Sequence, residues 1–290
     1  MNALFSGTDL RKLIIPLIFE QALAITVGMA DTMMISSVGE AAVSGVSLVD
    51  MINILMFNIM AALATGGAVV TSQCLGARHK EDARRSAKQL LYTVIFAGVL
   101  IGLIVILLRG PMLHLFFGSI ESDVMENALI YLTISAFSFP FLAVYNACAA
   151  LFRSMGNSQI TLKVSILINL INVAGNAICI FGLHMGAAGV AIPSLISRAV
   201  GSVILYILLR NPALDIFFVK EPFHLDLGMV KKILYIGIPS GVENGIFQLG
   251  RVLVVSIISG FGTVQIAANG VANNLDSVGI RVGQAVNLAM

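Results

Sequence analysis

Charged residues are scarce in this sequence. Asp, Glu, Lys and Arg together make up 11% of its 290 residues, whereas apolar residues make up 58%, and the mean hydropathy is +0.96. A soluble domain needs a charged surface, which this composition does not supply. The net charge of +2 is not gathered on a basic face, so we expect no nucleic-acid partner.

Residues for covalent or metal chemistry are also few. The three cysteines, Cys74, Cys148 and Cys179, show neither a disulfide framework nor zinc-site spacing. The four histidines fall in loops or at the ends of apolar segments, and none stands beside a paired acid within such a segment. No nucleophile constellation or phosphate loop is present. We therefore expect no enzyme activity and no cofactor.

What the sequence has in abundance is long apolar stretches. A helix that crosses about 30 Å of hydrocarbon needs about 20 mostly apolar residues. Eight stretches meet this requirement and predict an all-α polytopic membrane protein: 13–37, 46–72, 89–108, 128–152, 162–182, 189–209, 233–259 and 265–290.

The distribution of Lys and Arg predicts the orientation. The N-terminal segment and the loops 73–88, 152–163 and 210–232 lie on one side of the predicted membrane and hold thirteen of these residues, whereas the opposite side holds only Arg109. Because cytoplasmic loops are enriched in Lys and Arg, we expect a multi-pass protein of the inner cell membrane with a cytoplasmic N-terminus.

The first and seventh stretches form an internal repeat. They overlay without gaps at an offset of 223, which pairs Pro16 with Pro239, Glu20 with Glu243, Ser36 with Ser259, Gly39 with Gly262 and Val43 with Ile266. This period implies six spans per repeat and two parallel repeats around an axis along the membrane normal.

The repeat divides the chain into three parts. We expect an N-terminal six-helix lobe at 1–209, a cytoplasmic linker at 210–232 with two prolines, and the first two helices of an incomplete C-terminal lobe at 233–290. The sequence thus predicts a protein that stops after about eight of twelve spans.

Two carboxylates lie in the first stretch. Asp31 lies well inside it, and Glu20 precedes Asp31 by eleven residues, nearly three full helical turns, so both share one face. A carboxylate at membrane depth is costly and gains from binding a proton or a sodium ion. Asp31 is therefore a candidate coupling residue, with pairing to an interior arginine such as Arg198 as the alternative. Glu20, near the cytoplasmic end, is expected to reach the interface.

The fifth stretch carries three amides on one face. Asn169, Asn172 and Asn176 have helical spacings of three and four. Their carbonyl oxygens are hard donors suited to sodium or to holding a carboxyl group. The equally supported alternative is hydrogen bonding between helices, which is common in membrane bundles.

Several short motifs together resemble the multidrug and toxic compound extrusion (MATE) family. The resemblance covers essentially the whole chain and depends on the order and spacing of its motifs. They are 30–34 (ADTMM) with Gly39, 66–73 (GGAVVTSQ) followed by 75–77 (LGA), Arg84-Arg85, 152–157 (FRSMGN), the Asn169, Asn172 and Asn176 series, 237–239 (GIP) and 267–269 (AAN).

The resemblance implies a twelve-helix fold of two six-helix lobes around a central cavity. It also implies exchange of sodium or protons for organic, often cationic, drugs. By position, Asp31 resembles the coupling carboxylate of the family, Asn172 and Asn176 resemble its polar partners, and Ser194 stands where a threonine is frequent. Asp31, Asn172 and Asn176 are then the expected sodium ligands. Glu243 resembles an acid of some branches. Some members have aspartate at the place of Asn176, which leaves the coupling ion open.

The leading hypothesis is therefore a secondary active antiporter that exports drug-like small molecules. We expect the lipid bilayer and a coupling sodium ion or proton as its partners, and a monomer. A lipid-linked precursor flippase of the same superfamily is the alternative, although such proteins line the cavity with several cationic residues. A receptor or scaffold would not need Asp31 and the asparagine face.

Overall fold

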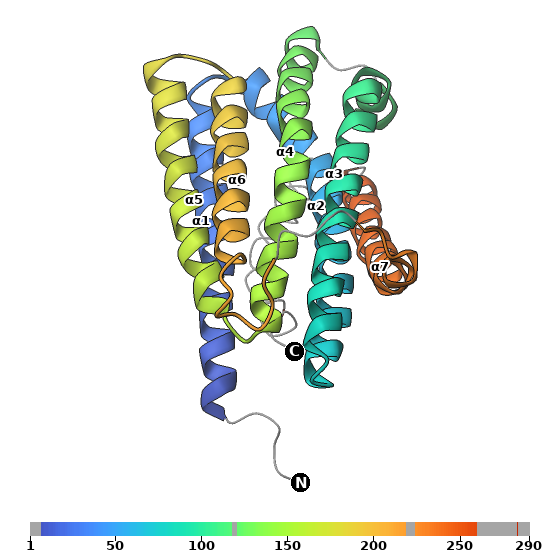
Figure 1. The fold of residues 1–290 in the computed structure, drawn as a ribbon. Coiled ribbons are helices and arrows are strands. Elements are labelled where there is room, and N and C mark those ends of the chain that lie inside the picture. The colour runs from blue at the N-terminus through green and yellow to red at the C-terminus, as the bar shows by residue number, and fades with distance from the viewer. Residues whose placement is uncertain (1–6, 118–120, 219–223, 260–282, 284–290) are drawn as a thin grey trace.

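The computed structural model describes residues 7–117, 121–218, 224–259 and 283, and the described part of the chain is helical without strands (Figure 1). Its elements are α1 (Gly7–Ser36), α2 (Glu40–Gly76), α3 (Lys80–Phe117), α4 (Ser122–Ser154), α5 (Ser158–Ala177), a π-helical turn η1 (Ile178–Gly182), α6 (Ala188–Leu208) and α7 (Leu227–Ser259).

The first six predicted membrane spans are confirmed as helices. α1 to α6, with η1 continuing α5, are long and apolar enough to cross a membrane. Several extend beyond the predicted stretches, because the polar residues next to these stretches continue the helices. α3 begins at Lys80 and runs through Pro111 to Phe117, nine residues before and nine residues after the predicted stretch 89–108.

The last two predicted spans have different outcomes. α7 forms as a helix of 33 residues where the seventh span was expected. The predicted eighth span, 265–290, lies outside the described residues.

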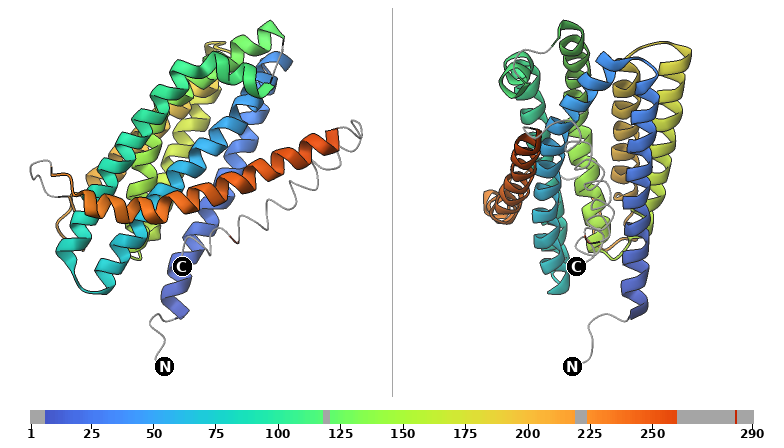
Figure 2. Two further views of the ribbon diagram at one scale, coloured as in Figure 1. Left: turned by 90° about the vertical axis from the view of Figure 1, so that its right-hand side faces the viewer. Right: turned by 180° about the vertical axis from the view of Figure 1, so that it is seen from behind.

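The six apolar helices pack in two groups. α1, α5 and α6 contact one another through α5, and α2, α3 and α4 contact one another around α4. The contact of α4 with α6 joins the two groups (Figure 1). α1 to α6 run in alternating directions, so the α2–α3 and α4–α5 connections and the end of α6 lie at the end of the bundle where α1 begins (Figures 1 and 2).

α7 packs obliquely across α2, with fewer contacts to α3 (Figure 2, left). The two backbones meet at Gly66 of α2 and Gly237 of α7. A Cβ atom at Gly66 would stand 2.7 Å from the backbone nitrogen of Gly237. Two glycines therefore permit this crossing, as small residues do elsewhere in membrane bundles.

Buried apolar side chains form two clusters along the bundle. One gathers at the α2–α3 turn and includes Leu90, Phe152, Leu205 and Ile216. The other lies toward the opposite end and includes Ile35, Phe139 and Ile180. The polar residues described below lie between helices that these clusters hold together.

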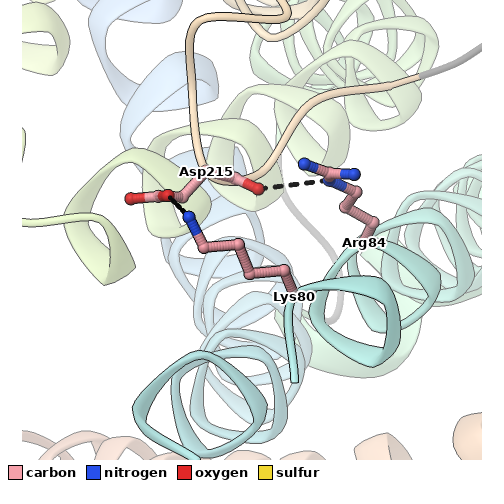
Figure 3. A network of polar contacts seen from close by, with 3 residues as sticks. All are labelled: Lys80, Arg84 and Asp215. Atoms are coloured by element: carbon pink, nitrogen blue, oxygen red, sulfur yellow. Dashed lines mark hydrogen bonds and ion pairs between the residues drawn. The ribbon is translucent and has the colours of Figure 1, made fainter. Parts of the chain in front are cut away.

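The segment after α6 is fastened to the start of α3 (Figure 3). Lys80 Nζ donates to Asp215 Oδ1 at 2.6 Å, and Arg84 Nε donates to the Asp215 carbonyl oxygen at 3.3 Å. The Arg84 guanidinium also lies 4.2 Å from the ring centre of Phe217. Ile216 is fully buried beneath these contacts, so the segment is anchored by an apolar side chain as well as by exposed charges.

Candidate functional site

Asp31 lies on the side of α1 that faces α5. Asn176 Nδ2 donates a hydrogen bond of 2.6 Å to Asp31 Oδ1. The α1 sequence around Asp31 is apolar apart from two threonines that bond back to their own helix. The carboxylate therefore finds its direct polar partner on another helix.

Two further polar groups continue from Asn176. Asn176 Nδ2 lies 3.4 Å from Asn172 Oδ1, and Asn172 Nδ2 donates to Ser194 Oγ of α6 at 2.9 Å. Asn176 is fully buried and Asn172 is 6% exposed. The Asn176 Oδ1 atom is buried without a hydrogen-bond donor from the described protein atoms.

The approach of α5 to α6 is set by one glycine. Gly175 contacts Pro193, and a Cβ atom at position 175 would stand 2.7 Å from the Pro193 Cβ. Asn176 and Ser194 are the next residues on the two helices, so this contact holds them in register. The helix then changes to a π-helical turn at Ile178, a local irregularity that is frequent at functional sites.

Arg198 lies on α6, one turn beyond Ser194. Arg198 Nη1 donates to Ser138 Oγ at 2.6 Å, and its guanidinium lies 4.6 Å from the ring centre of Phe57. It interacts electrostatically with both Asp31 and Asp50. Asp31 and Arg198, both described, do not form an ion pair within 4.0 Å, so they are not directly paired.

A second carboxylate, Asp50 of α2, lies in the same region and was not predicted from the sequence. Its Oδ1 accepts a hydrogen bond of 3.0 Å from the Tyr131 hydroxyl. Asn53 Nδ2 lies 3.4 Å from both Asp50 Oδ1 and Ser135 Oγ. The sequence does contain a pattern that could have predicted Asp50, because this residue falls inside a predicted span and Asn53 follows it at helical spacing.

The remaining predicted residues lie apart from this group. Asn169 donates to Ser165 Oγ at 3.3 Å and does not join the two other asparagines. Glu20 Oε2 accepts a bond of 3.4 Å from Thr161 Oγ1, so Glu20 and Asp31 both face α5, as their spacing predicts. Glu243 is exposed on α7.

The oxygen atoms around Asp31 suit a small, hard cation. The ligand types are one carboxylate, two amides and a hydroxyl, which favour sodium-like ions over transition metals. Nowhere in the described ranges do three His, Cys, Asp or Glu residues lie together as a metal cluster. The group is also able to hold a proton on Asp31.

Comparison with known proteins gives consistent relatives. A family model described as MatE matches residues 16–178, more than half of the chain. An uncharacterized transporter, YisQ of Bacillus subtilis, is 28% identical over 99% of this chain and 66% of its own length. A probable multidrug resistance protein, NorM of Thermotoga maritima, is 26% identical over 97% of this chain and 61% of its own length.

Solved structures share the fold. A MOP superfamily transporter from Pyrococcus furiosus has a TM-score of 0.90 at 20% identity, with 97% of this chain and 62% of that chain covered. An outward-facing multidrug resistance MATE family transporter has a TM-score of 0.87 at 21% identity, with the same coverage. The chain thus spans about two thirds or less of the length of these relatives.

Proposed function

This chain belongs to the MatE family, and from that membership and the site at Asp31 we propose that it acts in a secondary active antiporter. The family consists of transporters rather than enzymes, and the chain is a multi-pass membrane protein of the multidrug efflux type. In our proposal it exports organic, cationic small molecules in exchange for sodium ions or protons.

The observation that carries the proposal is the 2.6 Å hydrogen bond between Asn176 and Asp31. It holds a carboxylate between two membrane-spanning helices, where an uncompensated charge is costly. A bound cation or proton offsets this cost, so the occupancy of Asp31 changes the energy of the α1–α5 contact. Occupancy is thereby linked to the arrangement of the helices.

Sodium has specific support from the neighbouring amides. Asn176 Oδ1 is a buried acceptor to which no described protein group donates, and Asn172 Oδ1 and Ser194 Oγ belong to the same group. A cation interacts favourably with all of these oxygens, whereas a proton bound to Asp31 donates a hydrogen bond to only one acceptor. We propose Asp31, Asn172 and Asn176 as sodium ligands, with Ser194 as an additional oxygen and proton binding at Asp31 as the alternative.

We further propose the orientation and division suggested by the sequence. The Lys- and Arg-rich connections, among them the α2–α3 turn with Arg78 and Lys80, would face the cytoplasm together with the N-terminus. Residues 1–209 would form one lobe, 210–232 a cytoplasmic linker, and 233–290 the start of a second lobe to which Glu243 belongs. The protein would be a monomer in the inner membrane.

The flippase alternative finds no support among the relatives described above. It calls for several cationic residues around a cavity, whereas the group around Arg198 contains two carboxylates, Asp31 and Asp50. This excess of negative charge favours a cationic substrate.

Transport by inverted membrane vesicles that contain the full-length protein tests the proposal. We expect uptake of an organic cation such as ethidium to depend on an imposed sodium or proton gradient and to stop when that gradient is collapsed. Uptake that continues unchanged without either gradient would show that the protein is not an antiporter of this kind.

A further inference from the structure

Three charged side chains lie near one another inside the bundle, without forming an ion pair within 4.0 Å. Asp31 comes from α1, Asp50 from α2 and Arg198 from α6, and each carboxylate interacts electrostatically with the arginine. With both acids ionised, two negative charges and one positive charge leave a net charge of −1. One bound cation would neutralise the set, and a second would leave an excess positive charge among apolar helices.

The surroundings of Asp50 are polar and closely packed. Tyr131, Ser135 and Asn53 are 7%, 5% and 2% exposed. The Tyr131 hydroxyl already donates to Asp50 at 3.0 Å. The Asn53 Oδ1 atom is buried and receives no hydrogen bond from the described protein atoms. A buried amide oxygen without a donor is uncommon in proteins and calls for a partner.

The distances around Asn53 fit a cation better than hydrogen bonds. Its amide nitrogen lies 3.4 Å from both Asp50 Oδ1 and Ser135 Oγ, beyond the usual range for N–H···O bonds. Binding of a cation at this position requires rotation of the amide group, which turns the partnerless oxygen toward Asp50 Oδ1 and Ser135 Oγ in place of the nitrogen. Oxygen ligands about 2.4 Å from a cation of sodium or calcium size stand about 3.4 Å apart when they are at right angles around it.

We propose that Asp50, Asn53 and Ser135 form a second position for a sodium-sized monovalent cation, filled in alternation with the position at Asp31. The proposal rests on the proposed function, because it concerns the same coupling ion. Arg198 enforces the alternation, because its positive charge balances one of the two carboxylates and one bound cation balances the other. When the ion lies at Asp31, Arg198 compensates Asp50, and when the ion lies at Asp50, Arg198 compensates Asp31.

The two positions belong to different helix groups. The Asp31 position is built by α1, α5 and α6, and the Asp50 position by α2 and α4. Arg198 extends from α6 to Ser138 of α4 and Phe57 of α2. Transfer of the ion between the positions therefore changes the charge on both sides of the α4–α6 contact.

Equilibrium binding of radioactive sodium to the purified full-length protein tests the proposal through the number of ions bound. Asn53→Asp adds one negative charge at the second position with almost no change in volume, so it should bind one more ion than the wild type. Asn58→Asp is the matched control, because Asn58 lies on the same helix about 140° around its axis from Asn53, and this variant should bind no additional ion.

Removal of the positive charge is the second experiment. Arg198→Gln should bind one more ion than the wild type, whereas Arg198→Lys keeps the charge and should bind no additional ion.

A neutral substitution tests direct contact with the ion. In the Asn53→Asp background, Ser135→Ala should weaken the additional ion about tenfold by removing one oxygen ligand. Thr133→Ala, two residues earlier on α4 and bonded to Arg109 instead, should leave its affinity unchanged.

The outcomes separate this proposal from the proposed function. If Asn53→Asp and Arg198→Gln both bind the same number of ions as the wild type, the second position is overturned, regardless of the effect of substitutions at Asp31. Absence of sodium binding by the wild type would also overturn it. Unchanged transport in Asp31→Asn would overturn the proposed function, while the additional ion in Asn53→Asp would remain measurable and would support the second position.

Discussion

Gly175 of α5 and Pro193 of α6 are in direct contact, and a Cβ atom at position 175 would stand 2.7 Å from the Pro193 Cβ. Carbon atoms of side chains do not approach so closely, and the proline ring cannot turn away. The Asn172–Ser194 hydrogen bond of 2.9 Å crosses the same helix contact. The spacing of the polar group therefore depends on the absence of a side chain at residue 175.

The first prediction is that Gly175→Ala separates α5 from α6. We expect a loss of about 1–3 kcal/mol in unfolding free energy from overpacking and about tenfold weaker cation binding because the ligands move apart. Thermal unfolding with and without sodium measures both. Gly28→Ala in α1, where nothing lies within 4 Å of the added atom, is the control and should leave both values unchanged.

The second prediction concerns the asparagines. Asn172→Ala and Asn176→Ala should each weaken the sodium dependence of transport less than loss of the Asp31 carboxylate does, because each removes a neutral ligand and no charge. Asn169→Ala is the matched control, since Asn169 bonds Ser165 outside the group. A sodium dependence altered as much by Asn169→Ala as by Asn176→Ala would argue that these amides serve only helix packing.

The third prediction concerns topology. Glu81 at the start of α3 and Glu121 before α4 are both exposed and lie at opposite ends of the bundle (Figure 1). In a background without Cys74, Cys148 and Cys179, an impermeant thiol reagent added outside intact cells should label Glu121→Cys and leave Glu81→Cys unlabelled. The reverse labelling pattern would invert the proposed orientation.

The fourth prediction separates the two kinds of contact that hold the segment after α6 (Figure 3). Lys80→Ala should cost at most about 1 kcal/mol, because the Lys80–Asp215 pair is more than half exposed on both sides. Ile216→Ala should cost about 2–5 kcal/mol, because Ile216 is fully buried. Thermal unfolding of the two variants compares these effects, and equal losses would contradict the assignment of the anchor to Ile216.

Helical periodicity was sufficient to predict part of the site. The spacing of Glu20 and Asp31 placed both on one face, and both contact α5 in the structure. The spacing of Asn172 and Asn176 likewise placed them together. These relationships lie within single helices, where sequence separation fixes direction.

Contacts between side chains of different helices could not be predicted from helical periodicity. The partners of Arg198, which are Ser138 and Phe57, depend on how α6 crosses α4 and α2, and no spacing within one helix encodes that crossing. The same holds for Tyr131, which reaches Asp50 from a helix 81 residues further along the chain. Gly66 and Gly237 also permit the oblique crossing of α7 over α2, and hydropathy does not reveal this contact.

The central claim is that the Asp31 carboxylate couples transport to the cation. The direct measurement is uptake of an organic cation by inverted vesicles containing full-length wild type, Asp31→Asn or the exposed control Asp123→Asn, under imposed sodium and proton gradients. Asp31→Asn retains the shape of the side chain and removes its charge. We predict that Asp31→Asn is expressed normally and loses gradient-driven uptake, while Asp123→Asn retains it. Wild-type uptake by Asp31→Asn with unchanged ion dependence would contradict the account.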